Sequence, residues 1–316
     1  MVGKLTPYDI LTGTGVPVLL GLSKFQGPNE LLKSAFDSVA NIEPTYNKAN
    51  EAMTWGNILE PVIANRAALK LNLDKLNTEH TAANFHKSIP LAVSLDATAE
   101  GNGQEITTDW DNGIILMNAD KLKLEGQGCL EIKLTSQEPE NEPALYRGVY
   151  QLQAQMMCTG STWGCLCVLY KGIEMRLFVY KADKDMQKTI TDLALDFERR
   201  IDNYRKNQET EWYDFTNPRE ASSIYDEAED TVIDIPDFES VARRIVDINT
   251  AIKTMYAEKE DCESKIMEVM KENKTAMAGD YKIVWPTLNY KAKPEKLVPA
   301  KEAYSIRQSK LRIKQL

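Results

Sequence analysis

The sequence is poor in histidine and has no long hydrophobic run, and each absence removes a class of function. His80 and His86 are its only histidines and lie six residues apart in a polar stretch, so histidine-based metal sites and nucleophiles have little material. No run approaches the 18 or more apolar residues of a membrane span. Residues 1–7 contain no apolar segment of a secretory signal. We therefore expect a cytoplasmic protein without membrane contact, and if it is an enzyme, carboxylates with a metal ion are the chemistry that elimination favours.

Cysteine is also scarce. The five cysteines are Cys129, Cys158, Cys165, Cys167 and Cys262. Their number is odd, and three of them stand in an apolar stretch. Buried free thiols in a reducing compartment are the interpretation that this pattern favours.

Charge is distributed unevenly along the chain. The net charge of −9 does not by itself indicate a nucleic-acid-binding protein. Residues 207–240 hold eleven Asp or Glu against one Arg, whereas residues 281–316 hold nine Lys or Arg against two Glu. The basic tail is suited to meeting phosphates while the acidic stretch faces solvent or mimics a competing anion; an ordinary solvated charge pattern is the alternative.

Hydrophobic spacing predicts an α/β protein with a mixed sheet. Short apolar runs predict strands, and apolar residues at steps of three and four predict helices. A proline after Glu60 predicts that the first long helix begins or kinks there. Apolar residues recur every three or four positions from Phe238 to Val269, with an interruption at Lys259. This spacing suits a helix that packs antiparallel to the preceding helix, so that the two form an arm. The expected helices are residues 47–71, 144–159, 186–204 and 238–269, and the expected strands are residues 91–96, 129–134, 163–170, 175–180 and 281–285.

Carboxylates and a lysine are spaced along this framework in a way that suits a metal-dependent nuclease. Asp96 ends one strand, and Glu131 and Lys133 alternate on another, so both point to one face of the sheet. The other face of that strand is apolar, with Leu130, Ile132 and Leu134.

Mg²⁺ takes oxygen ligands and keeps several waters, so a few carboxylates and a carbonyl suffice. Asp96, Glu131 and the carbonyl of Ile132 are the natural set, and Glu60 completes a second metal position. Two metal ions would clamp the attacking and leaving oxygens of an in-line displacement.

Two further side chains complete the predicted site. Lys133 would orient or deprotonate the attacking water, and Gln151 would hold that water or a phosphate oxygen.

Five segments in chain order carry a resemblance to a known family: Leu11-Thr12-Gly13-Thr14 with Leu19-Leu20-Gly21-Leu22-Ser23, then Ala52 to Pro61, Ser94-Leu95-Asp96, Leu130-Glu131-Ile132-Lys133, and Tyr150 to Met156. Together they resemble the phage λ exonuclease and YqaJ-like viral recombinase family of the PD-(D/E)xK nuclease superfamily. The resemblance covers roughly residues 8–185.

The resemblance implies a restriction-endonuclease-like core with a mixed central sheet flanked by helices. It implies Asp96 and Glu131 as metal ligands, Glu60 at a second metal, Lys133 as the catalytic lysine and Gln151 as the active-site glutamine. It also places Thr14 near the pocket for a DNA 5′-phosphate. The cofactor implied is a pair of Mg²⁺ ions, for which Mn²⁺ can substitute.

The expected activity is exonuclease digestion of linear double-stranded DNA, 5′ to 3′, which leaves 3′ single strands for an annealing protein in phage-type recombination. The expected setting is the cytoplasm of a bacterial host, and the expected assembly is a homo-oligomer, for which the resemblance implies a trimer. A restriction-like endonuclease and a non-catalytic DNA-binding or assembly protein are the alternatives. The arm would serve oligomer contacts or the annealing partner, or simply pack on its neighbour.

Two features depart from the family pattern. The 35-residue separation of Asp96 from Glu131 exceeds the family's shorter spacing, which predicts an inserted hairpin. Pro7 stands where the λ enzyme carries an arginine for the 5′-phosphate. The expected domains are a nuclease core at residues 1–185, a helical arm with an acidic loop at 186–277, and a basic C-terminal segment with a hairpin-like start at 278–316.

Overall fold

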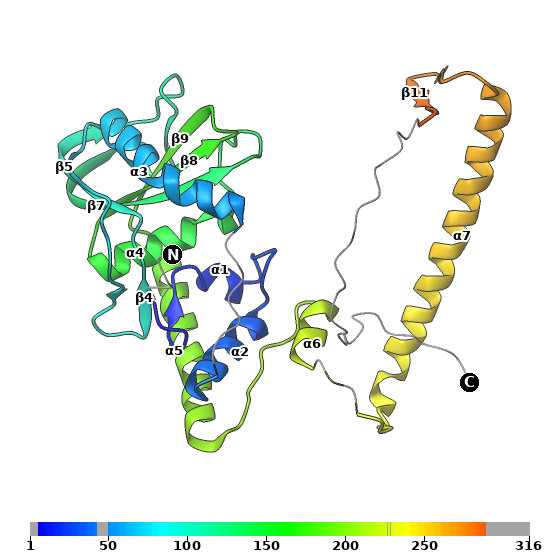
Figure 1. Ribbon diagram of the computed structural model, residues 1–316, viewed down its shortest axis with the longest axis horizontal. Helices are drawn as coiled ribbons and strands as arrows, with labels where there is room; N and C mark the ends of the chain where they lie inside the picture. Colours follow the sequence, from blue (N-terminus) through cyan, green and yellow to red (C-terminus); the bar gives the residue numbers. More distant parts are fainter. Residues whose placement is uncertain (1–5, 43–49, 226, 228, 289–316) are drawn as a thin grey trace, which may run out of the picture. The chain divides into compact units, whose positions relative to one another are not determined.

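The computed structural model describes residues 6–42, 50–225, 227 and 229–288 (Figure 1). The chain divides into two compact units, residues 1–224 and residues 225–316. Among the described residues, no helix has the length and apolar character needed to cross a membrane.

A six-stranded mixed sheet forms the centre of the first unit. Its strand order is β2-β5-β7-β8-β9-β6, in which β7 pairs with β8 and β6 with β9 in parallel while the other neighbours are antiparallel. The predicted mixed α/β sheet is therefore confirmed. The strands are β2 (Asp74–Asn77), β5 (Ala97–Ile106), β6 (Ile114–Leu116), β7 (Leu122–Thr135), β8 (Trp163–Tyr170) and β9 (Glu174–Lys181).

A second, three-stranded sheet holds the segments before the first carboxylate. Its order is β1-β4-β3, with β1 (Leu11–Thr12) parallel to β4 (Leu91–Val93) and β3 (Asn84–Phe85) antiparallel to it. The chain enters a short helix, α1 (Val16–Leu19), after β1. This pairing places the N-terminal Thr-Gly-Thr segment beside the strand that leads to Asp96.

Helices cover both faces of the six-stranded sheet (Figure 1). On one face, α3 (Glu51–Leu71) packs Ile63, Ala64 and Ala67 against Leu130 and Ile132 of β7. On the other face, α4 (Val149–Thr159) and α5 (Lys184–Asn207) enclose the larger core. A sheet that is buried on both faces shields from water any charged side chain that points inward from it.

Helix α3 carries Glu60 and passes through the following proline without ending. Its first residue is Glu51, where the side chain of Asn50 accepts a hydrogen bond from the Met53 amide at 2.9 Å. Pro61 lies inside the helix. The prediction that the helix begins at Glu60 was therefore wrong, because the Asn50 cap starts the helix at Glu51.

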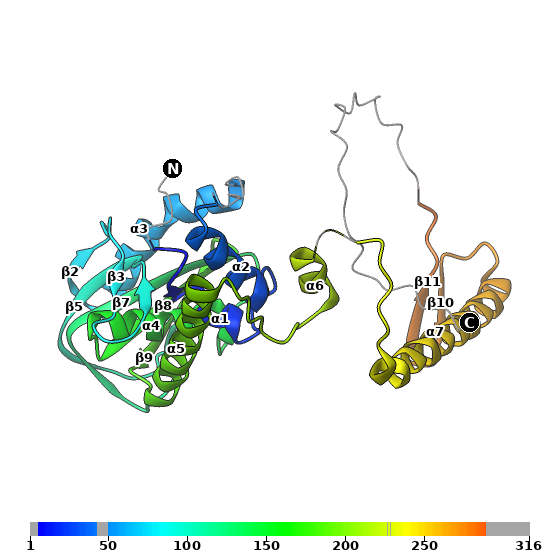
Figure 2. The same cartoon turned by 90° about the horizontal axis from the view of Figure 1, so that it is seen from below.

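Helix α5 belongs to the first unit, so this unit extends beyond the expected boundary at residue 185. Ile190, Ala194, Phe197 and Ile201 of α5 are buried in the core. Figure 2 shows α5 beside α1 and α2 (Pro28–Val39). Helix α5 does not form the predicted arm of two paired helices, because its apolar stripe packs in the core of the first unit.

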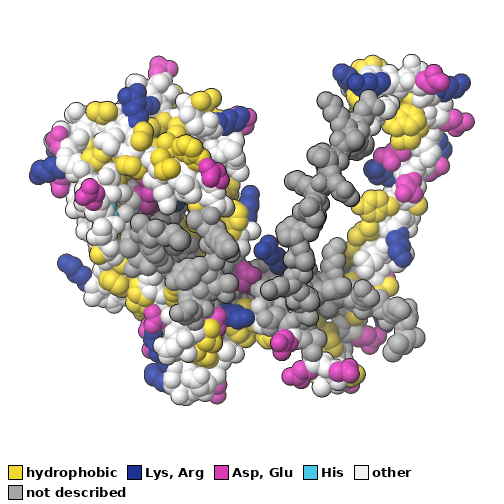
Figure 3. Space-filling model, in the orientation of Figure 1, with side chains coloured by type: hydrophobic (Ala, Val, Ile, Leu, Met, Phe, Trp, Pro, Cys, Tyr) yellow, Lys and Arg dark blue, Asp and Glu magenta, His cyan; other side chains and the backbone are white. Residues whose placement is uncertain are grey.

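The second unit contains one long helix and a hairpin. A 3₁₀ turn, η2 (Pro236–Phe238), leads into α7 (Glu239–Met270), and β10 (Thr275–Ala278) pairs antiparallel with β11 (Tyr281–Val284). Apolar side chains recur along α7 in the space-filling view (Figure 3). The strand expected at residues 281–285 is present, whereas the basic tail from residue 289 onward lies outside the described residues.

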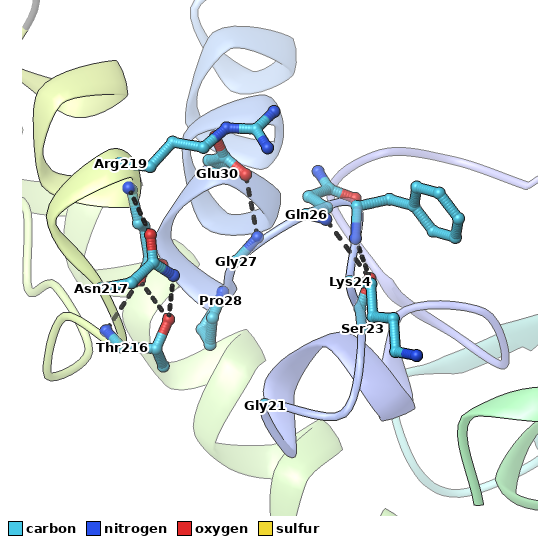
Figure 4. Close-up of a pocket in the computed structure, with 12 residues that line it drawn as sticks. Gly21, Ser23, Lys24, Gln26, Gly27, Pro28, Glu30, Thr216, Asn217 and Arg219 are labelled. Carbon is cyan, nitrogen blue, oxygen red and sulfur yellow. Dashed lines mark hydrogen bonds between the residues drawn. The ribbon is translucent and has the colours of Figure 1, made fainter. Parts of the chain in front are cut away.

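The end of the first unit docks on the N-terminus of α2 through α6 (Pro218–Ile224). The buried carboxylate of Glu220 accepts hydrogen bonds from the Asn29 amide at 2.6 Å and from the amide and hydroxyl of Thr216 at 2.9 and 2.8 Å. A polar pocket lies between this contact and the loop at Lys24 (Figure 4). The contact supplies α2 with a capping acceptor that its own Gly27 lacks.

Candidate active site

Strand β7 places a glutamate and a lysine on the face that α4 covers. Cys129 of this strand packs in the core beneath α4, whereas Leu130 and Ile132 pack in the core beneath α3. Glu131, which alternates with them, is completely buried, and Lys133 donates a hydrogen bond to its Oε1. The expectation that the two side chains share one face of the strand is met in the structure.

Asp96 lies next to this pair although it is 35 residues away in sequence. Antiparallel pairing of β5 with β7 aligns Ala97 with Leu130, so Asp96 is level with Glu131. The Asp96 carboxylate accepts a hydrogen bond from the Ile132 amide at 2.8 Å. The N–H and C=O of one strand residue point to the same edge, so the Ile132 carbonyl also points toward Asp96. The pairing of β5 with β7 thus brings Asp96 next to Glu131 despite the long insertion between them.

Helix α4 brings two glutamines to the glutamate and lysine. Gln151 accepts a hydrogen bond from Lys133 Nζ at 3.3 Å. Gln155 donates to Glu131 Oε2 at 2.6 Å and to the Ser94 carbonyl at 3.0 Å. The two glutamines are four residues apart and therefore share a helix face.

Gln155 was not among the predicted site residues, although its spacing from Gln151 was a usable signal. Gln153, which stands between them in the Gln-x-Gln motif, points away from the site. Its side chain donates to the Lys181 carbonyl at 3.1 Å and accepts from the Asp183 amide at 3.0 Å. Gln153 therefore joins α4 to the start of α5, and Gln155 fixes the rotamer of Glu131.

Gly148 precedes α4 and approaches both charged side chains. Its φ of +116° is in a region that residues with a side chain rarely adopt. A Cβ atom there would lie 3.1 Å from Lys133 Cε and 3.3 Å from Glu131 Cγ. The loop before α4 therefore passes close to both side chains and leaves no room for a side chain of its own at this position, which sequence patterns alone did not reveal.

The loop that ends at Gly148 is anchored by a buried arginine. The Arg147 guanidinium donates to both oxygens of Glu140, at 2.8 and 2.9 Å. Tyr170 of β8 donates to the same carboxylate at 3.3 Å. The neighbouring Tyr146 ring has the ammonium of Lys24 at 4.9 Å from its centre, a cation–π contact. This network holds the loop from β7 to α4 in place.

Burial and the neighbouring charges together shift the pKa values of the site. Burial, followed by the Asp96 carboxylate, raises the pKa of Glu131 to about 8. Burial and Asp96 also raise the pKa of Glu60, whereas Lys133 lowers it, which places Glu60 within electrostatic range of both. Burial opposes the charge on Lys133, but Glu131 and Asp96 outweigh it and hold the pKa of Lys133 above its ordinary value.

Thr14 lies beside the same site. Thr14 and Gln151 both line a small pocket that is closed by Thr12 and Ser94. The hydroxyls of Thr12 and Thr14 are 3.0 Å apart, and Thr14 is exposed. The structure thus brings the predicted phosphate-pocket residue next to the predicted active-site glutamine.

The donor set fits a divalent cation in its chemistry. Asp96 and Glu131 supply hard oxygen ligands, and a bound cation would offset the burial and the Asp96 charge that together raise the pKa of Glu131. Among the residues that the structure describes, no group of three or more Asp, Glu, His or Cys side chains converges as a ready-made site. The carboxylate pair and the Ile132 carbonyl are therefore the centre of the candidate site, with Glu60 at its margin.

The sequence model of the YqaJ-like viral recombinase domain family matches residues 8–162. Residues 8–162 therefore resemble a YqaJ-like viral recombinase domain. All the predicted site residues lie within this YqaJ-like domain, from Thr14 to Gln151. The match confirms the resemblance and supports a nuclease of the λ-exonuclease type.

Solved structures also resemble the chain that contains the YqaJ-like domain. They include the alkaline exonuclease LHK-Exo from Laribacter hongkongensis, determined alone and in complex with dAMP. In both cases the identity is 15%, the TM-score is 0.43, and the similarity covers 64% of this chain and 94% of LHK-Exo. No curated protein sequence matches the chain.

Proposed function

We propose that this protein is a Mg²⁺-dependent exonuclease that digests linear double-stranded DNA from the 5′ end. The 3′ single strand that remains would pass to an annealing protein in the cytoplasm of a bacterial host. The observation that carries the proposal is the hydrogen-bonded Glu131 and Lys133 on β7, with Asp96 beside them and Gln151 and Gln155 above. This combination of carboxylates, lysine and amides suits phosphodiester hydrolysis.

Two groups of residues would hold the cation. Asp96, Glu131 and the Ile132 carbonyl would bind one Mg²⁺, and Glu60 would contribute to a second; Mn²⁺, with the same preference for oxygen, would substitute. When bound, the cation supplies Lewis-acid stabilisation of the negative charge on the phosphoryl oxygens.

The chain's own residues do the rest of the work. The ammonium of Lys133 donates hydrogen bonds, and its raised pKa keeps it protonated, so we assign it to orienting the attacking water and offsetting charge on the phosphate. Deprotonation of water by Lys133, the other role considered for it, suits a lysine with a lowered pKa. Gln155 holds Glu131 in one rotamer, and Gln151 holds Lys133.

The pocket at Thr14 would receive the terminal 5′-phosphate. Its threonine hydroxyls donate hydrogen bonds, and Gln151 connects the pocket to Lys133. A terminal phosphate bound there would place the next phosphodiester at the carboxylates, which gives 5′-to-3′ polarity.

The test is digestion of linear and covalently closed circular duplex DNA with Mg²⁺, using separate 5′ and 3′ end labels. We expect loss of linear DNA only, starting at the 5′ label, and no cleavage by Glu131→Ala or Lys133→Ala. Cleavage of the circle would indicate an endonuclease, and full activity in either site variant would refute the assignment.

The same strand offers a matched pair of control variants. Lys123 and Glu125 are also two residues apart and form an ion pair at the other end of β7, where both side chains are exposed. Lys123→Ala and Glu125→Ala remove the same two residue types from an exposed pair, which contributes little to stability. Both should therefore cleave linear DNA at the wild-type rate.

A further inference from the structure

Helix α7 carries a seven-residue repeat that the described residues of its unit leave exposed. From Val241 to Val269, the positions that follow one another at alternating steps of four and three residues are apolar or thiol side chains, with Lys259 as the exception. In heptad notation the a positions are Ile245, Ile252, Lys259 and Ile266, and the d positions are Val241, Ile248, Met255, Cys262 and Val269. We call these nine residues the α7 seam; eight of them are apolar or thiol side chains.

Within residues 229–288, the described part of the second unit, nothing covers the seam. All 32 residues of α7 are described, and Met270 alone is buried. Seam residues remain in contact with water, for example Ile252 at 44% and Met255 at 67% exposure. A helix about 48 Å long gains most of its stability from packing its apolar face, so the exposed seam requires a partner.

The period of the seam identifies the kind of partner. A helix on a globular surface follows a 3.6-residue period and presents a broad apolar stripe. A narrow stripe with a strict seven-residue repeat drifts around a straight helix by about 20° per heptad, and it stays aligned only when helices with the same repeat coil around each other. A second copy of α7 has the same repeat because it has the same sequence.

Lys259 sets the direction of the helices. If two copies are parallel and in register, their lysines share one layer and every other layer remains free of charge. In an antiparallel pair each lysine would face an apolar side chain, so two layers would be broken. Lys259 also donates to Glu263 of its own chain at 2.6 Å, which draws its ammonium to the edge of the seam. A single polar a position of this kind is a common register device in coiled coils.

We propose that α7 is a homotypic interface, in which copies of this chain join through a parallel, in-register coiled coil along the seam. Ile and Val occupy a and d positions alike, a composition that favours more than two strands. The proposal assigns a partner to the second unit and does not depend on the nuclease activity of the first.

The first test measures the mass of the full-length protein by light scattering. In the seam variant, Ile248→Asp with Ile252→Asp, two charges enter adjacent layers, and we expect the mass per particle to fall. The matched control is Thr250→Asp with Ala257→Asp, which adds the same charges on the opposite, outward side of α7 and keeps the wild-type mass. A monomeric wild type, or equal masses for the seam variant and the control, overturns the proposal.

The second test reads the register directly through Cys262, which is exposed at a d position. A short bismaleimide should join Cys262 of neighbouring copies in the full-length protein, because d positions face each other in a parallel coil. Moving the thiol to the outward side, as Cys262→Ser with Ser264→Cys, should abolish the cross-link. Absence of the cross-link in the wild type, or its persistence when the thiol is moved, refutes the parallel register.

Discussion

Replacing Gly148 with alanine tests whether the loop before α4 positions the catalytic pair. Gly148 has φ +116°, where a residue with a Cβ is strained by about 1–3 kcal/mol. The new Cβ would also stand 3.1 Å from Lys133 Cε, 3.2 Å from Leu166 Cδ1 and 3.3 Å from Glu131 Cγ. Each neighbour must therefore move by a few tenths of an ångström.

Such a shift acts on the chemistry more than on substrate binding. A displacement of about 1 Å at a catalytic group costs roughly a hundredfold in rate, so a few tenths should lower kcat by roughly tenfold. The assay is single-turnover digestion of end-labelled linear duplex, combined with urea unfolding of the same preparation. KM for DNA should stay near the wild-type value, because Gly148 lies against the catalytic side chains and not along the surface that would bind the rest of the duplex.

The other end of α4 provides the matched control. Gly160 also has a positive φ, +75°, but a Cβ there would meet nothing within 4 Å. Gly160→Ala should therefore lose stability of a similar order, about 1 kcal/mol, and keep kcat. If Gly148→Ala cleaves DNA as fast as Gly160→Ala, the positioning role of this loop is wrong.

Three further outcomes follow from the site and its surroundings. Burial raises the pKa of Glu131 from 4.5 to about 8 in the folded protein, so the metal-free protein should lose stability as pH rises between these values. Mg²⁺ binds the carboxylate form and should therefore raise Tm more near pH 9 than near pH 6. A rise in Tm with Mg²⁺ that is the same at both pH values would contradict this. Gln155→Leu should weaken Mg²⁺ activation roughly 10–100-fold in a titration of activity, while Gln153→Leu on the far side of the same helix should leave it unchanged; equal effects would rule out a specific role. Glu220→Ala leaves three hydrogen-bond donors of Asn29 and Thr216 without their acceptor. It should lower the free energy of unfolding, measured in urea, by about 2–4 kcal/mol. A loss below about 0.5 kcal/mol would show that the docking of α6 does not depend on this carboxylate.

Local patterns were enough to predict much of the first unit. Alternation along β7 predicted that Glu131 and Lys133 share a face, because a strand turns successive side chains to opposite sides. The strands expected at residues 163–170 and 175–180 are β8 and β9, and Lys171 and Gly172 turn the chain between them at positive φ. These features depend on near neighbours in the chain, which a sequence displays directly.

Features that depend on distant pairing were not predicted. β6 lies at the far edge of the sheet beside β9, although the chain reaches it directly after β5. The apolar stripe of α5 is equally compatible with an arm and with core packing, and only the neighbouring α2 and α4 decide between them. The contribution of Gly148 needs a backbone angle, which no residue type specifies by itself.

The pairing of β5 with β7 has a consequence for how the site can be divided. Asp96 and Glu131 sit on two stretches of chain that are joined by nine aligned residue pairs and connected covalently only through residues 107–121. That connection includes a surface turn at Asp109 to Gly113, with Trp110 exposed. A chain interrupted at this turn would carry Asp96 and Glu60 on one fragment and Glu131 on the other. Nuclease activity would then report the reassembly of the two fragments, which makes this turn the natural place to build a split enzyme.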